Sequence, residues 1–338
     1  MTIMNKNSYN LCVAPMMGHT DAHFRYFLRL ISKHAMLYTE MVASNSILHN
    51  KSKKYDKLTH EQDNPVGFQL GGDDPKKLSE CAKIVESYGY DEINLNVGCP
   101  SKRAQSGNFG ACLFSQPDIV AKCVNEITKN SSLPVTVKTR LGIDNLNDII
   151  YLKDFIDKVS NSGVNTFHLH ARIAILKKGI NPKHNRTIPE INYERVYEIK
   201  KLFPNLKIIL NGEINGPNDA LNHLKYVDGV MLGRSICANP FLLNDIDILI
   251  NSEEVVGKKR VIEQYFDYIN KNFKKDVKIT DFTKHLTCLF KGYIGSKHTR
   301  AFMCHELNLE KYPLKKLEEL LFKEDLWING PDLYSKAI

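Results

Sequence analysis

Short apolar runs bounded by turn residues alternate with segments of helical periodicity along the first 232 residues. The apolar runs predict eight buried strands, at 11–16, 36–39, 64–72, 92–96, 133–138, 164–170, 206–211 and 227–232. The periodic segments predict helices at 21–32, 75–88, 118–129, 149–160, 194–203 and 218–224. Because strands that alternate with helices in this way pack as a parallel sheet enclosed by helices, we expect an α/β fold, a closed (β/α)₈ TIM barrel.

A doubly wound open sheet is the competing arrangement for such a pattern. It usually carries a glycine-rich fingerprint in the turn after its first strand. The turn at 15–18, Pro-Met-Met-Gly, has no such fingerprint. We therefore favour the barrel.

After about residue 245 the strand pattern stops, and helical spacing predicts three helices at 258–273, 282–294 and 314–322. The change predicts two domains, a catalytic barrel over residues 1–244 and a small all-helical domain over residues 245–338. Residues 255–300 contain eleven Lys or Arg and four Asp or Glu, so most of the net charge of +8 lies in this stretch. Such a face binds an acidic partner or is merely solvated, and charge alone does not decide between them.

Composition narrows the class of protein. The chain is 43% hydrophobic and 25% charged, which is typical of a soluble globular protein. No apolar run is long enough to span a bilayer, and the N-terminus lacks the layout of a signal peptide. Eight scattered cysteines form no Cys-x-x-Cys pair. They predict reduced thiols in the cytoplasm and argue against a zinc site. His168 and His170 share one strand face, but no carboxylate pair accompanies them, so we expect no metal.

The most informative stretch is 94–112, where a predicted strand runs into a loop that holds Cys99 between Gly98 and Pro100. Glycine frees the backbone and proline fixes it, and loops at strand ends are where barrels carry chemistry. A thiol placed there can give or take a proton. Cys99 can equally be a small buried hydrophobic residue, which is the commonest fate of an intracellular cysteine.

Candidate ligand-binding residues also follow other predicted strands. Asn211-Gly212 and Gly233-Arg234 follow the seventh and eighth strands, where such barrels commonly bind a phosphate through backbone N–H groups. Lys138, His170 and Arg234 would bring three potential cations to one mouth. A bound phosphate and an electron-rich ring would relieve their mutual repulsion.

Seven motifs together resemble the tRNA-dihydrouridine synthases, with the A-type branch as the nearest match. They lie at 13–16, 39–41, 69–72, 94–112, 137–140, 170–172 and 233–234, so the resemblance covers nearly the whole chain. It implies a barrel that binds FMN and a C-terminal helical domain that binds RNA. It also implies reduction of uridine in the D loop of tRNA, at positions 20 and 20a, with NADPH as electron donor.

The resemblance also implies residue roles, with Cys99 as the catalytic acid. The implied flavin contacts are Pro15, Met16, Met17, Gln69, Lys138, His170, Asn211, Gly212, Glu213, Gly233 and Arg234. The implied tRNA contacts are Asn96, Lys183, Arg186, Lys297 and Arg300. The chain departs from the family pattern at Gly18-His19, which replaces an acidic–aromatic pair, at Glu213, where glycine is common, and at Ala301, where a second basic residue is frequent.

These residue types suit the implied reaction. Reduction of the 5,6 double bond of uracil needs a hydride, which reduced flavin supplies, and a proton, which a thiol of ordinary pKa can give. Asn94 or Asn96 could polarise a uracil carbonyl, or could only tie the turn to the backbone. The base must be flipped out of folded tRNA, so a basic rim is expected, including Lys177 and Lys178 in the loop after the sixth strand.

Two alternative functions stay open at this point. One is an FMN-dependent dehydrogenase that acts on a free pyrimidine, and the other is a tRNA-binding protein without catalysis. The basic helical domain argues against the first, because a small substrate needs no such surface. We expect a monomer with no membrane association, and the sequence does not separate NADPH from NADH.

Overall fold

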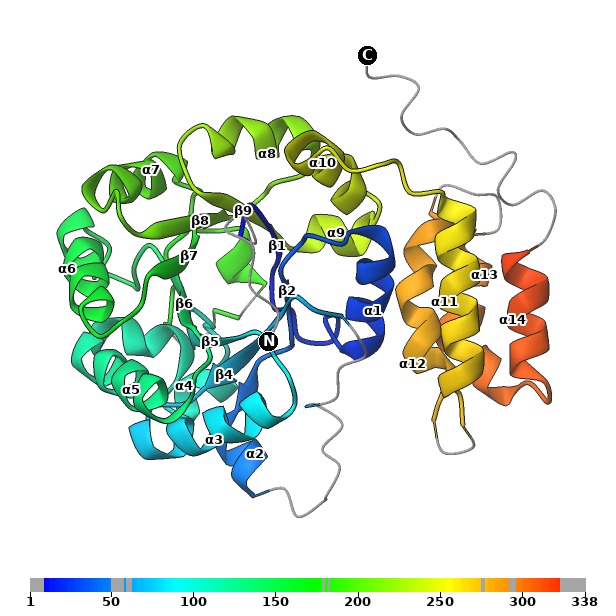
Figure 1. Cartoon of the computed structure of the whole chain (residues 1–338), viewed down its shortest axis with the longest axis horizontal. Coiled ribbons are helices and arrows are strands. Elements are labelled where there is room, and N and C mark those ends of the chain that lie inside the picture. Colours follow the sequence, from blue (N-terminus) through cyan, green and yellow to red (C-terminus); the bar gives the residue numbers. More distant parts are fainter. Residues whose placement is uncertain are drawn as a thin grey trace.

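The computed structural model describes residues 9–49, 58, 63–177, 180–181, 183–274, 277–291 and 296–322. Figure 1 shows a ring of strands enclosed by helices, with a second group of helices beside it. The barrel strands are β1 (Leu11–Val13), β2 (Leu37–Tyr38), β4 (Val66–Gly71), β5 (Glu92–Val97), β6 (Val135–Arg140), β7 (Thr166–His170), β8 (Lys207–Asn211) and β9 (Gly229–Leu232). All eight overlap the predicted strands, and their inner and outer faces are almost completely buried.

The sheet has the order β1-β9-β8-β7-β6-β5-β4-β2, with every neighbouring pair parallel. Met36, which precedes β2, closes the ring through an isolated parallel bridge to Cys12. Its N–H donates to Leu11 O and its carbonyl accepts from Val13 N, both at 2.9 Å. The predicted (β/α)₈ barrel is therefore confirmed. An additional strand, β3 (Val42–Ala43), pairs with the end of β4.

The six predicted outer helices are present as α1 (Ala22–Ile31), α3 (Pro75–Ser87), α5 (Pro117–Asn130), α6 (Ile149–Ser160), α7 (Tyr193–Leu202) and α8 (Pro217–Leu224). Aspartate side chains cap the N-termini of α1, α3 and α6, and proline occupies the first turn of α3, α5 and α8. The structure also has elements that periodicity did not predict: α2 (Ser44–Leu48), α4 (Lys102–Ser106) and 3₁₀ turns at Gly110–Ser115 and His184–Arg186 between these helices, and α9 (Arg234–Ala238) and α10 (Leu242–Asn251) after α8.

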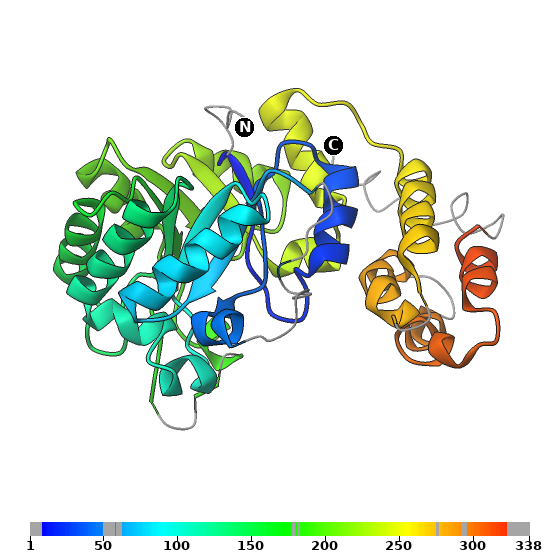
Figure 2. The ribbon, with the colours of Figure 1, turned by 60° about the horizontal axis from the view of Figure 1, so that its bottom comes forward.

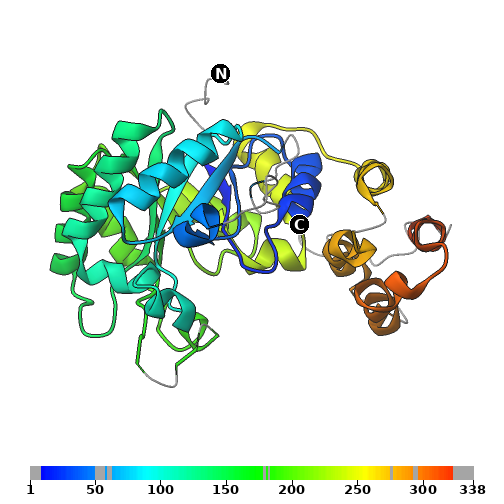
Figure 3. The same cartoon turned by 90° about the horizontal axis from the view of Figure 1, so that it is seen from below.

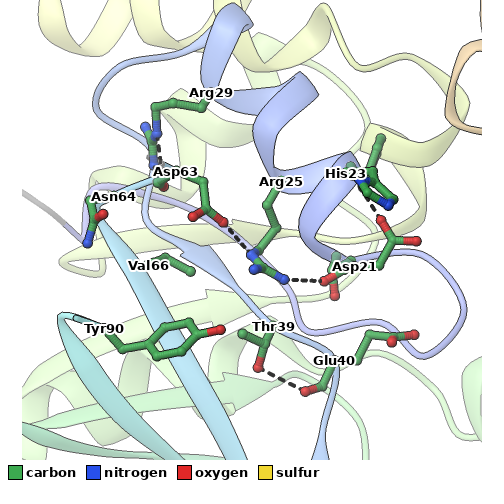
Figure 4. A network of polar contacts seen from close by, with 12 residues as sticks. Asp21, His23, Arg25, Arg29, Thr39, Glu40, Asp63, Asn64, Val66 and Tyr90 are labelled. Atoms are coloured by element: carbon green, nitrogen blue, oxygen red, sulfur yellow. Dashed lines mark hydrogen bonds and ion pairs between the residues drawn. The ribbon is translucent and has the colours of Figure 1, made fainter. Parts of the chain in front are cut away.

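Helix α1 is tied to the barrel by two arginines. Figure 4 shows Arg25 pointing from α1 to Asp63, with Arg29 one turn further along reaching the same segment. Arg25 Nε donates to Asp63 Oδ2 at 2.5 Å, and Arg29 Nη2 donates to the carbonyls of Ala35 at 2.7 Å and Pro65 at 3.0 Å. These bonds fasten the segment that enters β4 to α1, and so fix how α1 sits on the barrel wall.

The C-terminal helices are α11 (Lys258–Asn272), α12 (Ile279–Thr283), α13 (Ser296–Cys304) and α14 (Pro313–Leu321), with 3₁₀ segments at Lys284–Phe290 and Glu306–Leu309. The predicted helix at 282–294 is wrong for its described part, because α12 ends at Thr283 and a 3₁₀ segment replaces it up to Phe290. The segment closes its backbone bonds over three residues, as where Lys291 N donates to Cys288 O at 3.2 Å, and this tighter turn is the 3₁₀ pattern. Residues 292–295 lie outside the described part.

The C-terminal helices pack against α1 through aromatic rings. Tyr26 stacks on Tyr268 with ring centroids 4.0 Å apart, and Phe27 meets Tyr265 at 4.8 Å. Figure 2 shows α11 in yellow and the orange-to-red helices beyond it, joined to the barrel by the segment after α10. The predicted domain boundary at residue 244 falls inside α10, and we propose to place it after Asn251 instead. In the described part of the chain, no helix has the length and apolar character needed to cross a membrane.

Candidate active site at the mouth of the barrel

A cavity of about 800 Å³ opens at the carboxyl ends of the barrel strands. Loops and strand ends from β1, β4, β5, β6, β7, β8 and β9 all contribute to its wall. Figure 3 shows the barrel from the side, with the green part of the loop after β7 below the strands, on the side of this mouth. The volume lies in the range of cofactor and substrate sites, which is about 300–1,000 Å³.

The structure brings nearly all predicted site residues to this cavity. The predicted flavin contacts that line it are Pro15, Met16, Met17, Gln69, Lys138, His170, Asn211, Gly212, Glu213, Gly233 and Arg234. Cys99, Asn96 and Arg186 line it as well. Lys183 is exposed just before the 3₁₀ turn that contains Arg186, while Lys297 and Arg300 lie on α13. Lys178 lies outside the described residues.

The loop after β5 holds Cys99 half-buried at the cavity wall. Asn96 Oδ1 accepts hydrogen bonds from the backbone N–H groups of Gly98 at 3.1 Å and Cys99 at 2.9 Å. Gly110 has φ +78, and a Cβ on it would lie 2.5 Å from Cys99 O, so glycine is required for the chain to pass there. The Cys99 thiol donates to Ser101 Oγ at 3.3 Å. The thiol is thus positioned by its backbone and still faces the cavity.

The two asparagines of β5 have structural partners. Asn94 is completely buried below the cavity, where Nδ2 donates to Thr136 Oγ1 at 2.8 Å and Oδ1 accepts from Gln69 Nε2 at 2.7 Å. The hypothesis that Asn94 polarises a substrate carbonyl is therefore wrong, because its amide is not presented to the cavity. Asn96 ties the turn to the backbone, and its Nδ2 donates to Gln69 Oε1 at 2.8 Å.

Positive charge is concentrated and buried at the mouth. Lys138 Nζ donates to Asn211 Oδ1 at 2.9 Å, and burial, together with the nearby Arg140 cation, lowers the pKa of Lys138 from 10.5 to about 7. Burial and the neighbouring cations, Arg140 first, hold the pKa of His170 well below its usual 6.5, so its imidazole is neutral at pH 7. The site is therefore strained electrostatically unless an anionic or electron-rich ligand is present.

Arg140 is a site residue to which the sequence analysis assigned no role, although it belongs to one of the matched motifs. Its Nε donates to Gly98 O at 3.1 Å, and its Nη1 donates to Ile173 O at 2.9 Å and Asn185 O at 3.0 Å. The side chain thereby fastens the Cys99 loop to the loop after β7. Its position at the end of a predicted strand was the signal that could have identified it.

The turn after β8 has an unusual backbone. Gly212 has φ +140 and Glu213 has φ +47, and the second value is in the left-handed region that favours glycine. The Glu213 carboxylate forms an ion pair with Arg172 Nη2, whose side chain is buried. At position 213 the turn has a backbone conformation that glycine would adopt freely. Glu213 occupies it instead, and the ion pair with Arg172 holds its side chain in place.

The residues present fit a flavin mononucleotide. Glycine-containing turns after β8 and β9, next to Arg234, suit a phosphate, while Met16, Gln69 and half-buried Lys138 suit a ring with polar edges. The unbalanced buried cations are the observation that favours such a group. Among the described residues, no cluster of His, Cys, Asp and Glu could hold a metal ion.

Comparison with known proteins agrees with this geometry. Residues 12–324 match the family described as Dihydrouridine synthase (Dus). A tRNA-dihydrouridine(20/20a) synthase of Synechocystis sp. is 47% identical over 292 residues, which cover 86% of this chain and 87% of that protein. Proteins of the same name from Pasteurella multocida and Escherichia coli are 43% and 42% identical, over 91% and 93% of this chain and 94% and 95% of theirs. The chain belongs to the dihydrouridine synthase family.

Proposed function

We propose that this protein reduces uridine to dihydrouridine in tRNA, at positions 20 and 20a, with FMN as its flavin and NADPH as the electron donor. Enzymes of its family are flavin-dependent, and its relatives carry these tRNA positions in their names. The observation that carries the proposal is the thiol of Cys99 on the wall of the same cavity as every predicted flavin contact.

Each part of the mouth has a role in this proposal. Pro15, Met16, Met17 and Gln69 hold the flavin ring, Lys138 faces its polar edge, and His170, Asn211, Gly212, Glu213, Gly233 and Arg234 surround the ribityl chain and phosphate. The bound flavin supplies a hydride when reduced. Cys99 gives the proton to the carbon of the uracil 5,6 double bond that does not receive the hydride. Arg140 holds the Cys99 loop in place through its bond to Gly98 O.

Substrate tRNA is held by residues at the rim of the cavity and by positive charge outside it. We propose contacts from Asn96 and Arg186 at the mouth, Lys183 on the loop after β7, and Lys297 and Arg300 on α13. In Figure 3 the orange α12 and α13 lie toward the same lower side as that loop, so one RNA can touch both. Recognition by phosphate contacts leaves the target base to enter the cavity by flipping. A cytoplasmic monomer is part of this proposal, and gel filtration with tRNA tests its stoichiometry.

The decisive experiment maps dihydrouridine in tRNA from cells that lack the protein. Wild-type protein should restore the modification at positions 20 and 20a, and Cys99→Ala should not. Purified protein should be yellow, and the Cys99→Ala variant should keep its flavin. Turnover of free uridine as fast as tRNA would point to a dehydrogenase of free pyrimidines. A colourless protein that still binds tRNA would reduce the function to binding.

A further inference from the structure

A chain of buried side chains runs inside the barrel from its base to the Cys99 loop. Glu92, Asn94 and Asn96 alternate along β5 and so share the inner face of the strand. The strand register places Gln69 beside Asn94 and Asn94 beside Thr136. All five side chains are buried, with at most 7% of their surface exposed. The proposed mechanism assigns no role to Glu92, Thr136 or Asn94.

Every hydrogen bond in this chain points toward Glu92. The Thr136 hydroxyl donates to Glu92 Oε1 at 2.6 Å and accepts from Asn94 Nδ2 at 2.8 Å. Asn94 Oδ1 accepts from Gln69 Nε2 at 2.7 Å. Gln69 Oε1 accepts from Asn96 Nδ2 at 2.8 Å. Asn96 Oδ1 accepts the backbone N–H groups of Gly98 and Cys99.

The direction of the chain is fixed at both ends. At the mouth, backbone N–H groups can only donate, so Asn96 Oδ1 must be the acceptor and each following amide has one orientation. At the base, Thr136 has a single hydroxyl proton, which it must donate because it already accepts from Asn94. A carboxylate is the acceptor that satisfies this requirement, and Tyr9 OH donates to its other oxygen at 2.6 Å. A neutral partner at position 92 would leave at least one of these donors misdirected.

We propose that Glu92 is a positioning residue, whose carboxylate orients the Gln69 amide and the Cys99 loop through Thr136, Asn94 and Asn96. The inference rests on the proposed function for its catalytic consequence, since Gln69 is assigned to the flavin ring and Cys99 to the proton. Linked hydrogen bonds of one direction strengthen each other in a buried setting. Burial raises the pKa of Glu92 to about 7, and in its ionised form the acceptor at the barrel base reinforces the one orientation that the backbone N–H groups require at the mouth.

Three threonine variants test the chain with matched shapes. Thr136→Val removes the hydroxyl link and keeps the branched side chain, whereas Thr136→Ser keeps the hydroxyl. Thr139→Val makes the same change on the same strand, nearer to the mouth, at a buried threonine that bonds Val97 O instead. Glu92→Gln removes the carboxylate at the barrel base with little change in side-chain volume.

The first measurement is amide hydrogen exchange of the segment around Gly98 and Cys99 in flavin-free protein. Thr136→Val and Glu92→Gln should speed exchange there by about tenfold, the effect of losing one buried hydrogen bond. Thr136→Ser and Thr139→Val should exchange at the wild-type rate. Unchanged exchange in both Thr136→Val and Glu92→Gln overturns the proposal, as does an equal effect of Thr139→Val. If one of the two disrupting variants fails to fold, the other carries the measurement.

The second measurement is made on the flavin-loaded enzyme with tRNA. Thr136→Val and Glu92→Gln should shift the visible absorption of the bound flavin and lower kcat by about tenfold, with KM for tRNA changed less than about twofold. A rise in KM at unchanged kcat contradicts a role in positioning. The two measurements test different hypotheses. A wild-type protein that never reduces tRNA refutes the proposed function, whereas the exchange rates still show whether Glu92 orients the Cys99 loop through the hydrogen-bonded chain.

Discussion

The mouth of the barrel and the C-terminal helices are both rich in positive charge, but they hold it in opposite ways. Lys138 and Arg140 are largely buried, and burial lowers the pKa of both. Lys259, Lys271 and Lys297 on the helices are exposed to solvent. Buried cations cost folding free energy and are positioned for one ligand, whereas solvated cations cost little and attract any polyanion. The difference separates the proposed cofactor site from the proposed RNA-binding surface.

The strongest test of the barrel mouth as a specific catalytic site is the Cys99→Ala variant. If the thiol gives the proton, kcat should fall at least about 100-fold, as is usual for loss of a general acid. Flavin content and tRNA affinity should stay at wild-type values. Cys112→Ala is the matched control, since Cys112 is also half-buried but does not line the cavity. Stopped-flow oxidation of the reduced enzyme by tRNA measures the step, and equal losses in both variants would contradict the assignment.

Lys138 should make flavin binding depend on pH. Its pKa is about 7 in the ligand-free fold against 10.5 in water, so the folded chain binds fewer protons than the unfolded chain between these values. That deficit makes stability of the ligand-free protein rise with pH in this window. An anionic flavin favours the protonated amine, so binding takes up a proton, and affinity should fall by up to about 50-fold from pH 7 to pH 9.

Lys138→Met should weaken flavin binding and flatten this pH profile. Fluorescence titration of released flavin across the same pH range measures both effects. A Lys138→Met profile parallel to that of wild type would assign the dependence to another group.

For the C-terminal helices, Lys297→Ala and Arg300→Ala should each weaken tRNA binding by a few-fold. Each lost phosphate contact should reduce the slope of log affinity against log salt by about one. Lys153→Ala is the control, because Lys153 is exposed on α6, on the far side of the barrel from α13 in Figure 1. Filter binding at several salt concentrations measures the slope. Equal slopes in all three variants would remove α13 from the RNA surface.

The smallest effect is expected at Glu213, whose backbone at the cavity mouth adopts the left-handed conformation. Glu213→Gln and Glu213→Gly both remove the ion pair with Arg172, but only glycine relieves the backbone strain. The glycine variant should therefore be more stable than the glutamine variant by about 1 kcal/mol. Urea unfolding of the flavin-free variants measures the difference. Equal stabilities would mean that the positive φ carries no cost in this turn.

The sequence predicted those parts of the molecule where burial decides the outcome. Every barrel strand and outer helix follows from apolar spacing, because each buries a continuous face. The helix at 282–294 was wrong because the chain forms a 3₁₀ segment over Lys284–Phe290, and apolar spacing over so few residues does not separate a 3₁₀ from an α-helical turn. Asn94 was one of two asparagines offered either to polarise the substrate or only to tie the turn, because both lie at the end of a predicted strand. Alternation says nothing of depth along the barrel axis, and Asn94 lies one layer too deep.

The cap of α1 has a consequence for how RNA and cofactor communicate. Asp21 caps this helix and also binds His285 Nε2 at 2.9 Å and Lys284 Nζ at 2.6 Å from the C-terminal helices. Its neighbour Thr20 bonds Met16, which lines the cavity. The C-terminal helices are therefore anchored to the barrel, and a tilt of these helices would pull on the turn that leads to the cavity. A load on the C-terminal helices would thus reach the cavity wall through the short segment from Met16 to Asp21.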